Sequence, residues 1–188
     1  MEKLKTSQLS NRNRFGRGGW GIVNTLLFRP SPRPFFAWRR FLLRCFGAKV
    51  HQTALVYPTA RIWAPWNLEM AAHSCLGDYV DCYNVACIKL ETKAIVSQYS
   101  FLCTASHDFD SVEHSLVTAS IVLKPFSWIT ADVFVAPGVI VGAGAVVLAR
   151  STVLQDVESW KVSGGTPLRV LRDRRVSKVE LEDQFSEN

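Results

Sequence analysis

The stretch that decides the fold runs from residue 123 to residue 158 and reads LKPFSW ITADVF VAPGVI VGAGAV VLARST VLQDVE. A large aliphatic residue opens every block of six, and the fifth position is always Ser, Val or Ala. Residues 133–149 contain no charge, but Pro137 and the many valines argue against a membrane-spanning helix. A fixed sixfold period instead indicates a stacked repeat architecture.

The same template extends upstream in nine further hexads that begin at Val50. The fifteen hexads form five groups of three, with Cys82 as the exception among the leading residues and Trp66 among the fifth positions. Each group of three predicts one three-sided coil, and successive coils stack about 4.8 Å apart, the spacing of paired strands. One coil alone buries too little apolar surface, so the stack as a whole supplies the core. Strands of a sandwich, the alternative, do not keep such a register.

The hexads predict an all-β parallel β-helix of about five coils with short N- and C-terminal helical segments. We divide the chain into a basic arm and capping helix (1–49), a β-helix (50–160) with an inserted loop (108–122), and a C-terminal turn and helix (161–188). Residues 35–46 have helical spacing of apolar residues, which favours a helix that covers the open end of the stack. The alternative is a helix that rests on a membrane. Residues 1–15 are expected to form an arm without regular structure.

The charge is concentrated in the N-terminal segment. The net charge is +6, and residues 1–50 contain eleven Lys or Arg and one Glu, so the remainder carries −4. Such a segment is typical of contact with phosphates or anionic lipid, although a solvated arm is an equal alternative. The five cysteines form no Cys-x-x-Cys pair and follow no signal peptide, which predicts reduced thiols in a cytoplasmic protein.

The long insert after the third group carries the candidate chemistry. It reads TASHDFDSVEHSLVTAS from residue 104 to residue 120 and contains two of the four histidines. His107 closes its hexad, so the coil is expected to hold it at the base of the loop, where an imidazole suits proton abstraction from a hydroxyl. A surface or capping histidine is the alternative. Asn84 in the coil below is expected to orient an acceptor, or to be a corner asparagine.

Several of these segments resemble one family closely. They are Tyr83-Asn84, VSQYSFLCTASHDFD (96–110), WITADVFVAPGVIVGAGAVV (128–147), VSGGTPLRVLRDR (162–174) and LFRPSPRPFFAWRRFLLRCFGAKV (27–50). Over residues 20–175 the chain resembles the bacterial hexapeptide-repeat O-acetyltransferases, most of all their colanic acid and exopolysaccharide branch. That branch is similar to the galactoside, maltose and nodulation-factor acetyltransferases.

The resemblance implies a left-handed β-helix and a homotrimer that transfers acetyl groups from acetyl-CoA to a sugar or a nucleotide- or lipid-linked sugar. No metal and no nucleic acid are expected. The cysteines and the basic N-terminus predict a cytoplasmic location with a peripheral membrane contact. His107 matches the catalytic base, and Asn84, Tyr83 and Asp108 match the acceptor side. The residues that match the acetyl-CoA side are Trp128, Ala131, Ala149, Arg169 and Arg172.

The chain departs from the family at Leu154-Gln155, where Thr-Lys is frequent, which puts cofactor affinity in question. A non-catalytic scaffold for polysaccharide assembly is therefore one alternative, and an acyl carrier protein as donor is another. A third is a zinc-dependent hydratase on the same fold, which needs three histidines around the metal. His73, His107 and His114 are the available candidates.

Overall fold

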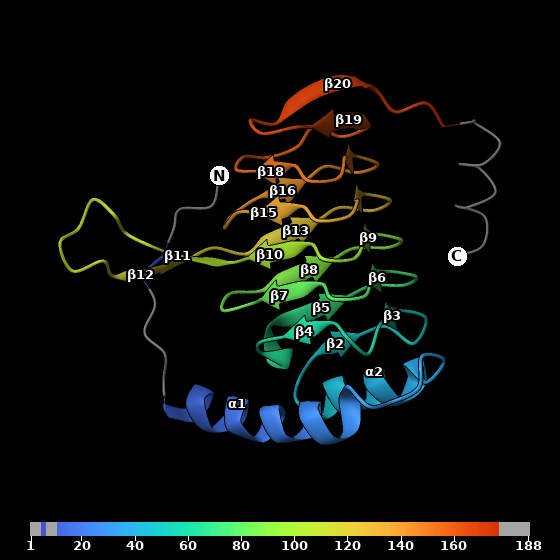
Figure 1. Ribbon diagram of the computed structural model, residues 1–188, viewed down its shortest axis with the longest axis vertical. Helices are drawn as coiled ribbons and strands as arrows, with labels where there is room; N and C mark the ends of the chain where they lie inside the picture. The colour runs from blue at the N-terminus through green and yellow to red at the C-terminus, as the bar shows by residue number, and fades with distance from the viewer. Residues whose placement is uncertain (1–4, 7–10, 177–188) are drawn as a thin grey trace.

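The protein is a three-sided stack of short parallel strands with helices at one end and a hairpin that projects from its side (Figure 1). The computed structural model describes residues 5–6 and 11–176. The hexads therefore fold as predicted, since each supplies one strand and one corner.

Each side of the stack is one parallel sheet. The first sheet contains β2 (Lys49–Val50), β5 (Leu68–Met70), β8 (Ile88–Leu90), β13 (Ile121–Leu123) and β16 (Ile140–Val141). The second contains β3 (Leu55–Val56), β6 (Cys75–Leu76), β9 (Ile95–Val96), β14 (Trp128–Ile129), β17 (Val146–Val147) and β19 (Lys161–Gly164), with β20 (Arg169–Asp173) added at its edge. The third contains β4 (Arg61–Ile62), β7 (Asp81–Tyr83), β10 (Phe101–Cys103), β15 (Phe134–Val135) and β18 (Thr152–Val153).

The strand register confirms the hexads residue by residue. In the second sheet, the leading residues Val56, Leu76, Val96, Ile129 and Val147 pair in one column, and each is fully buried. Cys82, the exception among the leading residues, occupies the equivalent inward position in the third sheet and is also fully buried. Its thiol therefore acts as a small apolar side chain, and burial raises its pKa far above the usual range.

The stack contains a sixth, incomplete coil beyond the five expected. Val157 bridges to Val141 in the first sheet, and Ser163 pairs with Val147 in the second. The template missed this coil because Val157 follows Val153 by four residues instead of six, and because Ser163 is polar. A side chain at Gly144, which has φ +63°, would overlap the Trp160 ring, so a glycine lets the sixth coil pack closely.

The expected C-terminal helix is wrong for residues 169–173, which form β20. This strand pairs antiparallel with β19, Lys161 opposite Asp173 and Gly164 opposite Arg169. The last coil would otherwise expose a free strand edge, and pairing with β20 covers it. Residues 177–188, the rest of the segment, lie outside the described residues.

The N-terminal helices cover the other end of the stack, as favoured from residues 35–46. They are α1 (Asn11–Val23), the π-helical turn η1 (Asn24–Phe28) and α2 (Phe36–Cys45); a short 3-10 turn, η2 (Pro65–Asn67), lies in the first coil. Trp20, Phe28, Leu42 and Leu43 are buried in the same core as the leading residues of the coils. The expectation of an unstructured arm over 1–15 is wrong where α1 begins at Asn11. Residues 1–4 and 7–10 lie outside the described residues.

The helical cap also satisfies the backbone of the first coil. Backbone N–H groups of each coil donate to carbonyls of the next, as Tyr57 does to Leu76, so the carbonyls of the first coil have no strand beneath them. Four side chains take that place: Arg44 donates to Val50, Arg40 to Ala54, Arg39 to Val56 and Trp20 to Ile62. Three of the N-terminal arginines thus donate hydrogen bonds to backbone carbonyls that have no strand partner.

Arg39 is the most enclosed of these groups. Its side chain is fully buried, with Nε 2.6 Å from the Val56 carbonyl and Nη1 2.9 Å from Ser31 Oγ and 2.8 Å from the Pro32 carbonyl. Burial lowers the pKa of this guanidinium, and the neighbouring charge of Arg40 adds to that effect. A buried charge is tolerable only when its donors are paired, as they are here.

Candidate active site

His107 ends β11 (Ala105–His107), the first strand of the projecting hairpin. Its Nδ1 lies 2.6 Å from the backbone carbonyl of His114, across the hairpin. A carbonyl oxygen only accepts hydrogen bonds, so Nδ1 carries the proton of the neutral ring and Nε2 keeps a free lone pair. The side chain is exposed. This arrangement gives a base with a fixed tautomer at the surface.

The hairpin is an ordered extension of the stack, whereas the sequence suggested a loop from residue 108. β11 pairs antiparallel with β12 (Leu116–Thr118), with His107 opposite Leu116, and β1 (Lys5–Thr6) adds a third strand on the far side of β12. At its neck, the Ala119 N–H donates to the Thr104 carbonyl at 3.0 Å. His107 therefore lies three residues beyond the stack, held by a strand ladder, and not at the corner itself.

Asp108 follows His107 in the hairpin, and Tyr83 lies at the end of β7, beside the neck of the hairpin. The Asp108 N–H donates to the Ser115 carbonyl at 2.9 Å, and its Oδ1 accepts from the Asp110 N–H at 3.1 Å, which shapes the turn after His107. Tyr83 faces outward from β7, and its carbonyl accepts from both N–H and Oγ1 of Thr104 at the neck. The structure thus brings three of the expected residues to one edge of the third sheet.

Asn84 is not in this group on the surface. Its side chain is fully buried; Oδ1 accepts from the Ala64 N–H at 2.9 Å and Nδ2 donates to the Ala64 carbonyl at 2.6 Å. Both ends of the amide bond to the coil below, beyond β4. Asn84 therefore helps to hold the wall together, and its acceptor role stays a prediction.

The residues expected on the acetyl-CoA side gather along the second sheet. Trp128 is exposed on β14, Ala131 and Ala149 lie in the corners that follow β14 and β17, and Arg169 and Arg172 lie on β20 at the end of that sheet. The two corners are stacked, since the Arg150 N–H donates to the Ala131 carbonyl at 3.0 Å. They form one column from the fourth coil to the end of the stack.

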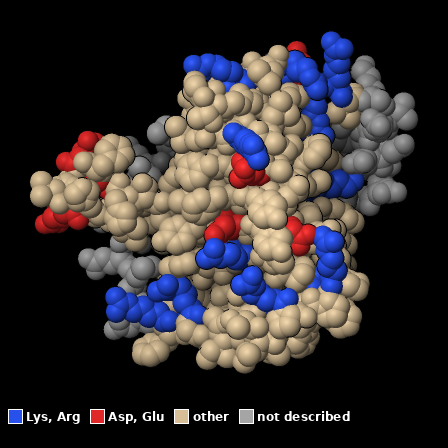
Figure 2. All heavy atoms as spheres, in the orientation of Figure 1, with Lys and Arg blue, Asp and Glu red and all other residues tan. Residues whose placement is uncertain are grey.

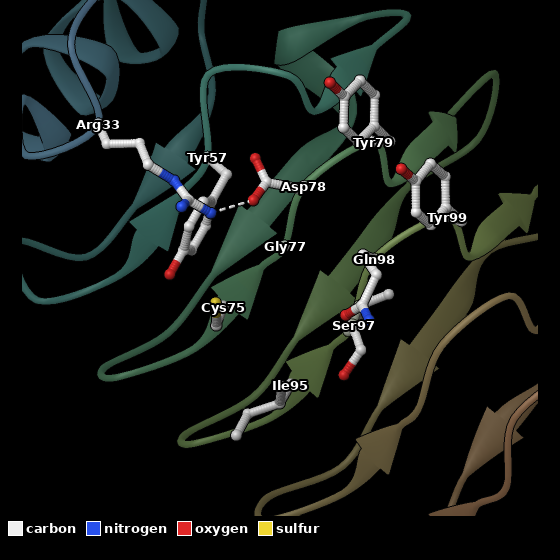
Figure 3. Close-up of a pocket in the computed structure, with 11 residues that line it drawn as sticks. Arg33, Tyr57, Cys75, Gly77, Asp78, Tyr79, Ile95, Ser97, Gln98 and Tyr99 are labelled. Atoms are coloured by element: carbon white, nitrogen blue, oxygen red, sulfur yellow. Dashed lines mark hydrogen bonds and ion pairs between the residues drawn. The ribbon is translucent and has the colours of Figure 1, made fainter.

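A hollow of about 460 Å³ continues this column toward the cap (Figure 3). Tyr79 and Tyr99 stack at its edge, their ring centroids 5.1 Å apart, and the Arg33 guanidinium pairs with Asp78. The hollow adjoins the expected thioester end, because Trp128 Nε1 donates to Ser97 Oγ at 2.9 Å and Ser97 lines the hollow.

Sequence reasoning missed Ser97, Tyr99 and Arg33 at this site. The available signal was the coil register, which sets Ile95 beside Trp128 and therefore places Ser97 one coil below Thr130, next to the position of Ala131. Arg33 had no such signal, because it lies in the irregular segment between η1 and α2 and reaches Asp78 only through folding.

The two groups of candidate residues lie at opposite edges of the third sheet. Ala131 and Ala149 precede β15 and β18, whereas His107 follows β10, and the strands are parallel. The intervening side is five residues long, about 15 Å at strand rise, and the hairpin projects further out (Figure 1). Within one chain, His107 therefore does not face the acetyl-CoA column.

Metal chemistry finds no support in the residues that the structure describes. Among residues 5–6 and 11–176, no group of three or more His, Cys, Asp or Glu is placed to hold a metal ion. His73 lies at a corner of the second coil, whereas His107 and His114 lie in the hairpin, so the three zinc candidates are not brought together. The five cysteines are unpaired, and burial raises the pKa of Cys75 to about 11.

Comparison with known proteins identifies the family. No protein-family model matches the sequence. The chain is 39% identical over 155 residues to the colanic acid biosynthesis acetyltransferase WcaF of Escherichia coli strain K12, which covers 82% of this chain and 85% of that protein. The chain belongs to the WcaF acetyltransferase family. The resemblance drawn from the hexads and the histidine segment is thereby confirmed, and so is the acyltransferase class.

Solved structures place the WcaF-type chain among the hexapeptide-repeat enzymes. The hexapeptide-repeat acetyltransferase VCA0836 of Vibrio cholerae, solved with acetyl-CoA, is 27% identical with a TM-score of 0.77 and covers 89% of this chain and 91% of that one. A maltose O-acetyltransferase of Clostridium difficile has a TM-score of 0.80 at 19% identity, covers 89% of this chain and 90% of its own, and shares the fold. No helix among the described residues is both long and apolar enough for a membrane span.

Proposed function

We propose that this chain transfers an acetyl group from acetyl-CoA to a sugar hydroxyl in the biosynthesis of an exopolysaccharide or a related glycan. The observation that carries the proposal is the bond from His107 Nδ1 to the His114 carbonyl at 2.6 Å, which leaves Nε2 free to take a proton. The 39% identity to WcaF supports the acetyl donor and the glycan pathway.

The reaction is a direct transfer between two bound substrates. His107 Nε2 takes the proton of the acceptor hydroxyl while its oxygen attacks the thioester carbonyl. The carbonyl oxygen becomes an oxyanion beside the Ala131 N–H, and collapse of the tetrahedral intermediate breaks the C–S bond. The imidazolium returns its proton to the leaving thiolate, so the products are the acetyl ester, coenzyme A with a free thiol, and the neutral enzyme.

The active site lies between neighbouring chains of a homotrimer. One chain supplies His107, with Tyr83 and Asp108 beside the acceptor. Its neighbour supplies the column of Trp128, Ala131, Ala149, Arg169 and Arg172, with the indole near the thioester and the arginines near the nucleotide phosphates. This division follows from the separation of about 15 Å, set by strand rise, between the two groups in one chain.

The enzyme works in the cytoplasm with a peripheral contact to the membrane through its basic N-terminal region. The five unpaired cysteines agree with a reducing compartment. Eleven of the twenty-two Lys and Arg lie in the first fifty residues, which favours an anionic surface as neighbour.

A subunit-mixing experiment tests the shared site. Chains with His107→Ala are unfolded and refolded together with Ala149→Trp chains, which block the acetyl-CoA column at an exposed corner. Random mixing restores sites with two intact halves, so thiol release from acetyl-CoA should return to about a quarter of the parent rate. The acceptors are a panel of nucleotide sugars and lipid-linked oligosaccharides.

Three results would contradict the proposal. Mixed assemblies that stay inactive, although each variant is trimeric by sedimentation, place the whole site within one chain. A parent protein that forms trimers but binds no acetyl-CoA in calorimetry is a scaffold. A parent that accepts acetyl groups only from an acyl carrier protein has a different donor.

A further inference from the structure

The cap presents a row of large apolar side chains on the side that faces away from the stack. We call it the outer strip; its members are Phe15, Ile22, Leu26, Leu27, Phe35, Trp38 and Phe41. Phe15, Ile22 and Leu26 have relative exposures of 82%, 64% and 65%, while Trp20 and Phe28 of the same segment are buried against the core. An apolar helix face that stays exposed, opposite one that is buried, indicates a surface that contacts a partner.

The outer strip is continuous across the helices. Ile22 and Leu26 are four residues apart, so they lie on one face of their segment. Trp38 Nε1 donates to the Leu27 carbonyl at 3.1 Å, which joins α2 to η1, and the Trp38 ring stacks on Phe41 with centroids 5.8 Å apart. These contacts join η1 and α2, so Leu27, Trp38 and Phe41 lie together on the surface of the cap.

The cap carries positive charge without acidic residues. Residues 11–48 contain eight arginines and no Asp or Glu. Arg33 pairs with Asp78 of the second coil, and among the described residues it is the one cap arginine in an ion pair. In the view of Figure 2, the helical end shows basic and uncharged atoms and no acidic ones. Arg39, Arg40 and Arg44 donate to carbonyls of the first coil. Arg14 and Arg29 are exposed and form no ion pair with another described residue.

We propose that the outer strip, together with the exposed Arg14 and Arg29, forms a docking surface for an anionic lipid bilayer, on which the stack stands upright. Apolar side chains enter the boundary between headgroups and acyl chains, while the guanidinium groups meet lipid phosphates. The inference sharpens the membrane contact of the proposed function and is independent of acetyl transfer.

A bilayer suits the cap better than a second copy of this chain. A symmetric contact would set the same surface against itself, and arginines would then meet arginines with no acidic partner on either cap. Anionic headgroups supply the missing negative charge. The aromatic residues of the strip are typical of the interfacial region.

The upright orientation sets the height of the active site. The cap covers the first coil, and the hairpin leaves the third (Figure 1). Two strand spacings and one helix diameter place His107 about 20 Å above the lipid surface. The height of the site above the bilayer does not matter for a free nucleotide sugar. A glycan that is anchored to a membrane lipid reaches this height when it is several sugar units long. The orientation thus favours a lipid-linked glycan as acceptor.

Flotation of the full-length protein with vesicles tests the proposal. Vesicles with 30% phosphatidylglycerol in phosphatidylcholine are expected to carry the parent chain upward, and pure phosphatidylcholine vesicles to carry far less. The double variant Leu26→Gln/Phe41→Gln should partition at least tenfold less. Arg14→Gln/Arg29→Gln should bind on the order of 30-fold more weakly to the anionic vesicles, since each lost charge near the surface costs about fivefold.

The matched control is Tyr79→Gln/Tyr99→Gln, which removes two equally exposed aromatic residues from the wall and should bind vesicles like the parent. A parent that stays unbound, or a control that loses as much binding as the strip variant, overturns the proposal. So does a strip variant that alters the oligomeric state instead of vesicle binding. The assay contains no acetyl donor, so its failure leaves acetyl transfer untouched, and loss of transfer in His107→Ala leaves vesicle binding untouched.

Discussion

The chain leaves its repeat in two places, the helical cap and the hairpin, and the two are built in opposite ways. The cap turns apolar side chains into the core, and four of its side chains donate hydrogen bonds to the carbonyls of the first coil that have no strand partner. The hairpin is held by its own strand ladder and leaves His107 exposed. A segment outside the repeat that packs on the core, like the cap, stabilises the fold. A segment that projects from the core, like the hairpin, can expose side chains that react with a substrate.

The sharpest test of this contrast is the substitution His107→Ala. The loss of the general base should lower acetyl transfer about 10²–10⁴-fold. The free energy of unfolding should change by less than about 0.5 kcal/mol, because the imidazole is exposed and packs on little. Thiol release and urea unfolding measure the two effects on the same preparation.

His73→Ala is the matched control, since His73 is an exposed histidine at a corner of the wall. It should keep the parent rate. A His107 variant that transfers acetyl groups at the parent rate, while folded and trimeric, would end the assignment of His107 as base.

The opposite result is expected for Arg39→Met in the cap. The variant leaves the Val56 and Pro32 carbonyls without their donor, which should lower the free energy of unfolding by about 3 kcal/mol or more. Transfer measured well below the melting temperature should remain near the parent rate. Arg29→Met, an exposed arginine of the same cap, is the control and should unfold like the parent. Equal stability of the two variants would contradict edge capping.

The sequence assigned Asn84 to the acceptor site, whereas its hydrogen bonds give it a role in the wall of the stack. Asn84→Ala tests which of the two roles it has. The Ala64 N–H and carbonyl both lose their partner inside the wall, so the free energy of unfolding should fall by about 2 kcal/mol. The KM for the acceptor should stay within about twofold of the parent. A raised acceptor KM with unchanged stability would return Asn84 to the acceptor site.

The stack could be read from the sequence because its rule is local: one aliphatic residue in six, small residues at the corners. The rule fails where interactions other than the repeat determine the structure. The sixth coil begins with a four-residue step to Val157, and β20 forms because the strand edge of β19 needs a partner. The charge excess of residues 1–50 predicted contact with an anionic surface, but Arg39, Arg40 and Arg44 of α2 donate to carbonyls of the first coil instead.

The candidate site divides in the same way. His107 was found because its segment interrupts a strict repeat and resembles a family pattern. The bond from its Nδ1 to the His114 carbonyl could not be foreseen, since it depends on how the hairpin closes. The burial of Asn84 was hidden for a related reason: its partner Ala64 lies twenty residues away, in a coil where the 3-10 turn η2 replaces regular pairing.

The smallest expected effect concerns the departure at Leu154-Gln155, in the corner that follows β18, on the edge that the proposed trimer sets against the acetyl-CoA column of a neighbouring chain. Leu154 has a relative exposure of 69%, so Leu154→Thr/Gln155→Lys restores the frequent family pair without disturbing the core. One added cation near the nucleotide phosphates should tighten acetyl-CoA binding about two- to fivefold, as expected for an exposed charge pair of about 1 kcal/mol or less. Calorimetry at low and high salt measures the change in acetyl-CoA affinity, and the gain should fall as salt rises.

Leu154→Thr alone is the control and should bind acetyl-CoA nearly like the parent. A gain that persists at high salt, or that the single variant reproduces, would mean that the added charge does not face the phosphates and that the column ends elsewhere on the stack.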